Sequence, residues 1–467
     1  MSTQSPGPSF SELPLSPATL ENLERLGYRS MTPIQAASLP LGLAGRDLIA
    51  QAKTGSGKTA AFALVLLSRL TASRAAGVQA LVLSPTRELA EQVAQEIRRL
   101  ARAEENVKVL VLCGGTPIRP QLASLEHGAH VVVGTPGRVL DHLSRGTLRL
   151  DALCTLVLDE ADRMLDMGFF EDMQRVIEAC PAARQTLLFS ATFPEPVARL
   201  ARQFTRDAEE VRLAEQHAPT KIRQVFYRIE ERERLGAVAA LLDHYRPAST
   251  LAFCNTRRRC RELVELLTAR GFLAQALHGE LEQVERDQVL VQFSNRSLSV
   301  LVATDVAARG LDIAELEAVI NVEVTPDPDV HVHRIGRTGR VDQEGWALSL
   351  SSLEELAYVA RIEEASGTKV PWQPLSALKR SGREPLLPPM VTLQIQGGRR
   401  EKLRPGDVLG ALTGSAGFRA EQVGKIQVTE MSTYVAVERG IADEARTRLA
   451  SGKLKGRTVK VRRLGGA

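Results

Sequence analysis

Between about residues 45 and 345 the chain alternates short apolar runs with longer amphipathic segments. The runs are rich in Val, Leu and Ile and are apolar on both faces, which is typical of parallel strands buried between two helical layers. The intervening segments are expected to form the covering helices. The pattern therefore predicts a doubly wound α/β architecture, with ligands at the carboxyl ends of the strands. The predicted strands include 48–50, 80–84, 130–134, 155–159, 186–190, 250–253, 300–304 and 319–323.

Two polar stretches interrupt this alternation and divide the chain. Residues 207–220 (DAEEVRLAEQHAPT) and 381–390 (SGREPLLPPM) lack the apolar runs of their surroundings, and the second is rich in Pro. We interpret both as parts of linkers. The two α/β domains are compatible with distant copies of one fold. The expected segments are a first α/β domain (1–206), a linker (207–218), a second α/β domain (219–368), a linker (369–389) and a C-terminal module (390–467).

The C-terminal module has a different pattern of elements. Runs of β-forming residues predict four strands, and two amphipathic stretches predict helices. The predicted order βαββαβ is the ferredoxin-like arrangement that RNA-recognition motifs use. The expected elements are 391–396, 405–412, 425–429, 433–438, 441–450 and 458–463.

Composition agrees with a globular protein and separates the module from the rest. The chain has 467 residues, of which 44% are hydrophobic and 25% are charged, and this excludes a disordered, collagenous or small disulfide-rich architecture. The net charge is +5, yet residues 390–467 carry 15 Lys and Arg against 7 Asp and Glu. This excess indicates a polyanion-binding appendage on a near-neutral body. A solvated basic face without a ligand is the alternative.

Several features favour a cytoplasmic protein without a membrane segment. The five cysteines form no CxxC pair, which favours free thiols over disulfides or a zinc site. The longest apolar run, Ala60 to Leu67, is far shorter than the ~20 residues that span a bilayer. The first ten residues have neither the basic nor the apolar region of an export signal.

Residues 52–59 (AKTGSGKT) are predicted to form a phosphate-binding loop between a strand and a helix. The glycines allow backbone N–H groups to face phosphates, and the helix N-terminus adds its dipole. We expect Lys58 to reach the β- and γ-phosphates of a nucleotide and the Thr59 hydroxyl to ligate Mg²⁺. Ala52 stands where the generic motif has its first glycine. The predicted ATP-binding residues of the loop are Ala52, Lys53, Thr54, Gly55, Ser56, Gly57, Lys58 and Thr59.

An acidic pair at the end of a predicted strand supplies the second half of an ATPase. Residues 156–162 read LVLDEAD. Asp159 is placed to hold Mg²⁺ directly or through water, and Glu160 to orient and deprotonate the attacking water. Acidic strand ends are common caps, so this prediction depends on the phosphate loop upstream. We expect Asp159, Glu160 and Lys58 to be catalytic.

These motifs, in this order, resemble those of the DEAD-box RNA helicases of superfamily 2, over about residues 10–345. The resemblance implies two RecA-like domains, an RNA-dependent ATPase activity, ATP and Mg²⁺ as cofactors, and RNA rather than DNA as the partner. Phe10 and 27–35 (GYRSMTPIQ) resemble the adenine-reading motif, in which Phe10 stacks on the base and Gln35 binds its edge. Ser190 and Thr192, in the SAT sequence, match the motif that couples hydrolysis to strand separation.

Further motifs of this family imply RNA-backbone contacts in both α/β domains. They include 85–90 (PTRELA), 135–138 (TPGR), 254–257 (CNTR) and 303–313 (ATDVAARGLDI). Thr, Gly, Gln and Arg suit contacts with phosphate and 2′-OH rather than base edges, so this core is expected to read RNA without sequence preference. The implied RNA-binding residues are Arg87, Gly115, Thr135, Arg138, Arg257, Gln283, Arg286, Thr304 and Arg309.

Residues 333–340 (HRIGRTGR) hold three arginines separated by glycines that permit close approach to a ligand. Such arginines suit fingers that contact developing charge on a γ-phosphate. The resemblance assigns this catalytic role to Arg337 and Arg340, a ribose contact to Asp312 and a link between the two sites to His333. The alternative for His331 and His333 is an H-x-H metal pair or plain surface histidines.

The C-terminal module resembles the RNA-binding domain of the DbpA subfamily, as the core also does. This resemblance implies recognition of a hairpin in large-subunit (23S) ribosomal RNA and a role in ribosome assembly on pre-50S particles. The third strand of the module carries one aromatic residue, Tyr434, so base stacking on the sheet is not expected to dominate. The RNA-binding candidates are instead the basic residues Lys453, Lys455, Arg457 and Lys460. The alternative is that these basic residues bind any structured RNA without selectivity.

Two functions from different classes use all of these motifs. The first is an ATP-dependent helicase that remodels ribosomal RNA. The second is an RNA-triggered ATP-dependent clamp, or a general RNA chaperone, in which hydrolysis only times release. A DNA translocase of the same superfamily is disfavoured by the RNA-type motifs.

Overall fold

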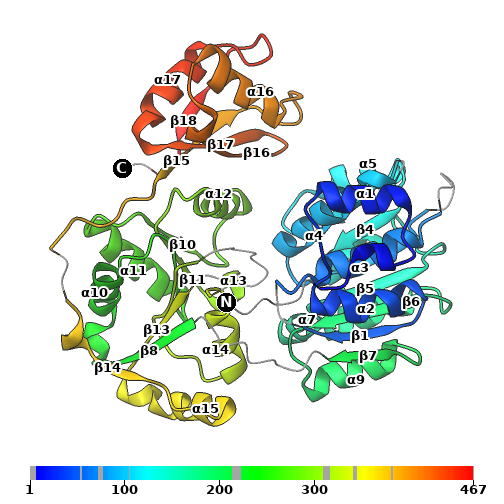
Figure 1. Ribbon diagram of the computed structural model, residues 1–467, viewed down its shortest axis with the longest axis horizontal. Helices are drawn as coiled ribbons and strands as arrows, with labels where there is room; N and C mark the ends of the chain where they lie inside the picture. Colours follow the sequence, from blue (N-terminus) through cyan, green and yellow to red (C-terminus); the bar gives the residue numbers. More distant parts are fainter. Residues whose placement is uncertain are drawn as a thin grey trace. The chain divides into compact units, whose positions relative to one another are not determined.

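The computed structural model describes residues 7–52, 55–71, 77–104, 106–212, 222–308, 316–339, 344–379 and 382–465. The chain divides into two compact units. The first contains the first α/β domain, and the second contains the second α/β domain with the C-terminal module (Figure 1). Within the described ranges, no helix combines the length and the apolar character needed to cross a bilayer.

The first unit is built on a seven-stranded parallel sheet, which confirms the architecture predicted from the apolar runs. Successive side chains enter opposite hydrophobic cores, because Ala80 and Val82 face one layer whereas Leu81 and Leu83 face the other. Across the sheet the strands are β3 (Val109–Leu112), β4 (Val131–Gly134), β2 (Ala80–Leu83), β5 (Thr155–Asp159), β6 (Gln185–Ser190), β1 (Leu48–Gln51) and β7 (Glu209–Arg212).

Helices cover both faces of this sheet (Figure 1). They are α1 (Pro17–Arg25), α2 (Pro33–Leu43), α3 (Lys58–Ser68), α4 (Arg87–Leu100), α5 (Ile118–Glu126), α6 (Pro136–Ser144), α7 (Ala161–Asp166), α8 (Phe170–Glu178) and α9 (Glu195–Phe204). The apolar faces of α2, α3 and α4 build one core, and those of α6, α7, α8 and α9 build the other.

β7 lies within the stretch 207–218 that its polarity suggested was a linker. It pairs in parallel with β1, and of its four residues only Val211 is buried. As the last strand of the sheet, β7 has one neighbour and exposes most of its side chains. A polar edge strand therefore has no apolar run by which the sequence could reveal it.

The second unit contains a seven-stranded parallel sheet with the same strand order as the first. The two α/β domains are thus copies of one topology, as their sequences allowed. Across this sheet the strands are β10 (Ala274–Leu277), β11 (Val300–Ala303), β9 (Thr250–Phe253), β12 (Ala318–Asn321), β13 (Gly345–Ser351), β8 (Ile222–Arg228) and β14 (Trp372–Pro374). The helices are α10 (Arg234–Tyr245), α11 (Arg257–Ala269), α12 (Gln283–Ser294), α13 (Asp305–Ala308), α14 (Pro328–Ile335) and α15 (Leu356–Ser366).

Corresponding strands of the two sheets lead into helices by the same local device. After β2, the Thr86 side chain accepts a hydrogen bond from Leu89 N at 3.3 Å and caps α4. After β9, the Thr256 side chain accepts one from Arg259 N at 3.2 Å and caps α11. A threonine cap satisfies a backbone N–H that the helix itself leaves unpaired. The helices that carry Arg87 and Arg257 therefore start at a fixed residue.

The C-terminal module is a four-stranded antiparallel sheet with two helices, and the predicted βαββαβ order is confirmed. Its own core lies between the sheet and both helices. The elements are β15 (Met390–Gln396), α16 (Pro405–Gly410), β16 (Val423–Val428), β17 (Ser432–Glu438), α17 (Ala442–Ser451) and β18 (Val461–Arg463), and the strand order across the sheet is β16-β17-β15-β18.

The other face of this sheet contacts α12 and the loop that follows it. Tyr434 of β17 is only 4% exposed and clusters with Val291 of α12 and Leu464. Asn295 Nδ2 donates a hydrogen bond to Thr392 Oγ1 at 3.1 Å, and Ser297 Oγ lies 2.6 Å from the same oxygen. The sheet face on which RNA-recognition motifs usually stack bases is therefore occupied by protein.

Candidate nucleotide and RNA sites

Three motif-bearing loops meet at the carboxyl edge of the first sheet because β6 pairs with β1 on one side and β5 on the other. The register places Gln51 opposite Ser190 and Asp159 opposite Phe189. The phosphate loop, the acidic pair and the SAT sequence consequently leave the sheet at the same level. The sequence predicted each loop, and the parallel pairing brings them together.

Lys58 is buried at the start of α3, and its Nζ donates a hydrogen bond to Ala52 O at 2.7 Å. The ammonium group thus points back across the loop that it follows. Gly57 adopts a φ of +94°, and a Cβ at this position would lie 2.6 Å from Gln35 Nε2. Gln35 Nε2 in turn donates to Gly57 O at 3.1 Å. Glycine is required here by both the backbone conformation and the close approach of Gln35.

Phe10 occupies the short helical turn before α1 and is only 4% exposed. Its ring meets the Tyr28 ring edge-on, with the two centroids 6.1 Å apart. Phe10 thus belongs to the first hydrophobic core. Its stacking on adenine stays a prediction.

The acidic pair is buried, with Asp159 at 3% and Glu160 at 4% exposure. Burial and, to a smaller extent, the adjacent Glu160 carboxylate raise the pKa of Asp159 to about 7, although the charge of Lys58 opposes this rise. Glu160 has a φ of +52°, an uncommon conformation for a residue with a side chain, and precedes α7. Glu160 Oε2 lies 3.3 Å from Arg163 Nε, also buried. A cluster of buried charge at a strand end marks a candidate functional site.

Asp162 connects the acidic loop to the SAT loop, a role that the sequence reading missed. Its Oδ2 accepts hydrogen bonds from Ala191 N at 3.2 Å, from Thr192 N at 2.8 Å and from Thr192 Oγ1 at 2.8 Å. Its own N–H donates to Ser190 Oγ at 3.3 Å. The carboxylate thereby fixes the loop that contains both expected coupling residues. Only the last letter of LVLDEAD hinted at this function, and nothing in the sequence identified its partners.

The donors at this edge fit Mg²⁺. Asp159 offers a carboxylate and Thr59 a hydroxyl, both oxygen ligands of the kind that Mg²⁺ prefers. Among the described residues, no group of three or more His, Cys, Asp or Glu side chains is placed to hold a metal ion. Mg²⁺ commonly binds through one or two carboxylates together with substrate phosphates, so it does not need such a group.

The expected RNA contacts of the first unit follow β2, β3 and β4, three neighbouring strands. Arg87 is the first residue of α4, and Gly115 has a φ of +73° in the loop after β3. Thr135 precedes α6 and donates its N–H to Leu112 O at 3.1 Å. Both guanidinium ends of Arg138 lie 3.2 Å from Thr116 O. The structure thus gathers these four residues at one edge of the sheet.

The expected RNA contacts of the second unit have protein partners. Arg257 forms an ion pair with Glu280 at 2.8 Å, and Gln283 Nε2 donates to Asp287 Oδ1 at 2.8 Å. Arg286 Nη2 donates to Ala307 O at 2.8 Å. Thr304 O accepts the N–H groups of Ala307 and Ala308 at the start of α13. Five further expected site residues lie outside the described residues, namely Lys53, Thr54, Arg309, Asp312 and Arg340.

The helix α14 carries His333 and leads to the buried Arg337. Arg334 lies between them and is buried. The sequence did not indicate that it connects several elements. Its guanidinium binds both Asp305 oxygens at 2.7 Å, Asn255 Oδ1 at 2.9 Å and Glu323 O at 2.7 Å. Arg334 therefore joins α14 to the elements that carry the expected RNA contacts Arg257 and Thr304.

His331 is 2% exposed and lies against the Phe226 ring, with the two centroids 5.8 Å apart. Burial and, to a smaller extent, the charge of Arg334 lower the pKa of His331 to about 4. A neutral imidazole packed against an aromatic ring is a core residue. The structure therefore gives no support to the alternative of an H-x-H metal pair.

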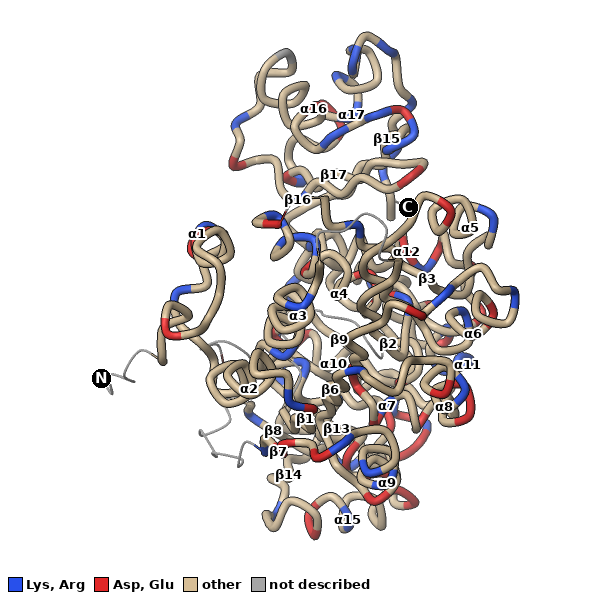
Figure 2. The backbone as a smooth tube through the Cα atoms, turned by 90° about the vertical axis from the view of Figure 1, so that its right-hand side faces the viewer, with Lys and Arg blue, Asp and Glu red and all other residues tan. Residues whose placement is uncertain are grey.

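In the C-terminal module, several loops contain Lys and Arg positions (Figure 2). Lys453, Arg457 and Lys460 are exposed. Lys455 instead connects two loops, because its Nζ donates to Lys402 O at 2.5 Å and lies 3.2 Å from Asp407 Oδ2. Lys402 and Lys455 both have a positive φ, of 59° and 50°. Lys455 thus holds its own loop against the loop that contains Lys402, and both loops carry exposed cations.

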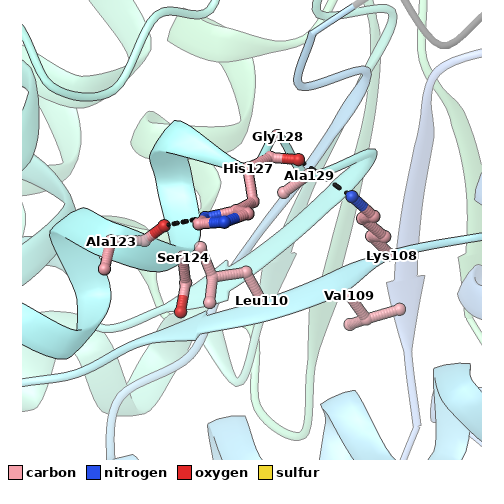
Figure 3. Close-up of a pocket in the computed structure, with 8 residues that line it drawn as sticks. All are labelled: Lys108, Val109, Leu110, Ala123, Ser124, His127, Gly128 and Ala129. Carbon is pink, nitrogen blue, oxygen red and sulfur yellow. Dashed lines mark hydrogen bonds between the residues drawn. The ribbon is translucent and has the colours of Figure 1, made fainter.

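A separate hollow of about 380 Å³ lies at the outer edge of the first sheet, between β3 and α5 (Figure 3). Lys108 Nζ donates to His127 O at 2.8 Å, and His127 Nδ1 lies 2.6 Å from Ala123 O. The lining contains no buried charged residue, since Lys108 and His127 are both exposed. This hollow is distinct from the loops that carry the expected nucleotide and RNA contacts.

Comparison with protein families gives three matches in the order of the three segments. Residues 32–200 match the DEAD/DEAH box helicase family, and residues 233–342 match the helicase conserved C-terminal domain. Residues 392–463 match the DbpA RNA binding domain.

Individual proteins agree with these matches. The chain is 51% identical to the ATP-dependent RNA helicase DbpA of Escherichia coli, over 96% of this chain and 98% of that protein. It is 45% identical to the ATP-dependent RNA helicase CshA of Listeria monocytogenes, over 79% of this chain and 70% of that protein. A structure of Dbp5 of S. cerevisiae bound to RNA and ADP BeF3 aligns with a TM-score of 0.72 and 31% identity, over 79% of this chain and 96% of that one.

The buried Asp159 predicts a pH-dependent stability. Its folded-state pKa of about 7 exceeds the ordinary value of 3.8, so the folded chain loses stability as the pH rises through this window. Asp159→Asn should therefore raise the free energy of unfolding, and by more at pH 8 than at pH 5. Urea titrations without nucleotide or divalent cations measure this difference. Asp151→Asn, which alters a carboxylate with 77% side-chain exposure, is the control and should show no such trend.

Proposed function

The chain belongs to the DEAD-box family of ATP-dependent RNA helicases, and from this premise we propose that it uses ATP to remodel structured large-subunit ribosomal RNA. The observation that carries the ATP-dependent part is the convergence of three loops at one edge of the first sheet. Three loops leave adjacent strands there. They carry Lys58, the buried acidic pair and the SAT sequence, and Asp162 holds the last of them by hydrogen bonds.

We assign the chemistry of hydrolysis to side chains of that edge. Lys58 would exchange its bond to Ala52 O for the β/γ-phosphates of ATP. Thr59 and Asp159 would hold Mg²⁺, which neutralises phosphate charge when bound. Glu160, whose Oε2 lies near Arg163, would orient and deprotonate the attacking water. Arg337 and Arg340 of the second domain would contact the transferred phosphoryl group.

RNA binding by the two α/β domains would use the loops after neighbouring strands. The cationic and backbone donors of these loops suit phosphates and 2′-hydroxyls, so this part would grip RNA without reading its sequence. We propose the domain limits 1–206, 219–368 and 390–467, with β7 added to the first sheet and β14, which lies in the expected linker 369–389, added to the second. We also propose that the protein acts in the cytoplasm, on pre-50S particles.

We assign selectivity for ribosomal RNA to the C-terminal module. Two facts support this assignment: the match to the DbpA RNA binding domain and the exposed cations Lys453, Arg457 and Lys460. Because Tyr434 is covered by α12, stacking on that sheet face would contribute little. The competing function is an RNA-triggered clamp or general RNA chaperone, in which the same cations hold any structured RNA.

Glu160→Gln and Lys58→Ala should separate two functions of the nucleotide site. Glu160→Gln removes the proposed base and preserves the phosphate cradle, so ATP and RNA should still bind while hydrolysis slows by ~10²-fold or more. Lys58→Ala removes charge that faces the phosphates, so both nucleotide affinity and hydrolysis should fall. Equilibrium binding of a fluorescent ATP analogue and phosphate release measure the two effects. Parental turnover in Glu160→Gln would refute the general-base assignment.

The module assignment is tested in the full chain, because deleting the module would expose the face of α12 that it covers. Replacing Lys453, Arg457 and Lys460 with Gln should raise the concentration of large-subunit rRNA needed for half-maximal ATPase activity, by roughly tenfold. Stimulation by an unrelated RNA of equal length should change far less. The control replaces three exposed cations outside the module, Arg228, Arg361 and Lys369, with Gln.

The loss of affinity for the two RNAs distinguishes a module that selects ribosomal RNA from one that holds any structured RNA. Equal loss for both RNAs would favour the general grip over rRNA selectivity. Release of a labelled strand from a tailed duplex, with and without ATP, would distinguish a helicase that remodels RNA from a clamp that only times release.

A further inference from the structure

Two buried polar side chains of the first unit, Gln121 of α5 and His142 of α6, lie between two loops with proposed RNA contacts. Gln121 is 8% exposed and His142 is fully buried. Neither belongs to the motifs that the family resemblance identified. Burying a polar group costs free energy unless the group finds a hydrogen-bond partner. The partners of these two side chains therefore indicate what they do.

Hydrogen bonds link Gln121 to the loop after β3. Its Nε2 donates to Cys113 O at 3.0 Å and to Thr116 Oγ1 at 2.8 Å. Thr116 Oγ1 itself donates to Cys113 O at 3.1 Å. Because a carbonyl oxygen accepts only, the amide nitrogen of Gln121 must face the loop. Both ends of the turn that contains Gly115 are thereby held by one side chain.

The opposite side of the Gln121 amide contacts α6, the helix that follows Thr135. His142 Nε2 lies 3.1 Å from Gln121 Oε1, and since that oxygen accepts, Nε2 must carry the proton. Burial lowers the pKa of His142, and the charges of Arg138 and Arg145 lower it further against the opposite effect of Asp141. Nδ1 lies 2.9 Å from Thr147 Oγ1, a hydroxyl that also donates to His142 O at 3.1 Å. The bond to Gln121 Oε1 places a proton on Nε2 and fixes the orientation of the ring.

A second contact closes the connection between the two loops. Arg138, four residues before His142 on α6, places both guanidinium ends 3.2 Å from Thr116 O. Thr116 therefore contacts Gln121 through its hydroxyl and Arg138 through its carbonyl. The loop after β3 and the start of α6 form one hydrogen-bonded body.

We propose that Gln121 and His142 are positioning residues that hold the Gly115 turn in register with Thr135 and Arg138, so that successive phosphates of one RNA strand meet both loops. This inference rests on the proposed RNA contacts of those three residues. The two side chains would touch neither RNA nor ATP. Their effect would be confined to RNA affinity, because the nucleotide loops leave other strands of the sheet.

The test uses Gln121→Met and His142→Phe in the full chain. Each removes hydrogen bonds while retaining side-chain bulk, and each should raise the RNA concentration for half-maximal ATPase activity by roughly five- to tenfold. The KM for ATP and the turnover at saturating RNA should stay within about twofold of the parent. The double variant should lose less than the product of the single losses, because the residues act in one chain of hydrogen bonds.

Gln185→Met is the matched control for lost stability. Gln185 is 2% exposed and donates to Gly42 O at 2.8 Å and Arg46 O at 2.7 Å, so it also holds a loop of the first unit, one without proposed RNA contacts. This variant should lower the midpoint of thermal unfolding while RNA affinity stays unchanged. If all three variants weakened RNA binding in proportion to lost stability, or if Gln121→Met and His142→Phe did not fold, the positioning role would be overturned in favour of a structural one.

Arg138→Ala separates failure of this inference from failure of the function on which it rests. If Arg138→Ala weakens RNA binding and the Gln121 and His142 variants do not, the positioning role is wrong and the proposed contacts stand. If Arg138→Ala has no effect either, the RNA contacts assigned to this edge are wrong and the positioning role falls with them.

Discussion

In the first unit, β6 lies between β1 and β5, and the register of these three parallel strands decides where the motif-bearing loops meet. Each strand is buried on both faces, so a shift of one residue would turn every side chain toward the wrong core. The register is therefore held by packing over the whole sheet. The packing of the sheet therefore also fixes the positions of the residues at the strand ends. The two-layered core thus determines the distance between Lys58 and the acidic pair.

The charged residues at this edge are buried, yet their surroundings differ. Asp162 accepts three hydrogen bonds, which compensate the loss of hydration and leave it a structural anchor. At Asp159, burial outweighs the charge of Lys58 and the hydrogen bond from the Glu160 backbone, and the pKa is raised. At two positions three residues apart, one in β5 and one in α7, the protein thus holds one carboxylate with three hydrogen bonds and another whose charged form is disfavoured in the absence of a cation. That contrast separates the residue that holds the loop from the residue that is suited to a ligand.

Sequence patterns predicted the two sheets because buried parallel strands have an unmistakable apolar composition. They failed for β7 and for β14, both of which lie at a sheet edge within an expected linker, because exposure removes the apolar signal. Motifs located the phosphate loop and the acidic pair, since the chemistry requires those residue types at that spacing. The roles of Asp162 and Arg334 depend on partners about 30 and 80 residues away in the chain, and no local pattern encodes such partners. Tyr434 shows the same limit, because only the fold reveals that α12 covers it.

The contact between the C-terminal sheet and α12 has a consequence for protein engineering. A domain that recognises RNA is often treated as a cassette that can be moved between enzymes. Here the face around Tyr434 is completed by Val291, Asn295 and Ser297 of the neighbouring domain. A chimera that grafts the module onto another core would leave this apolar and polar surface without its complement unless α12 and the loop after it were transferred as well. A functional transfer therefore requires the module together with α12 and the loop that follows it.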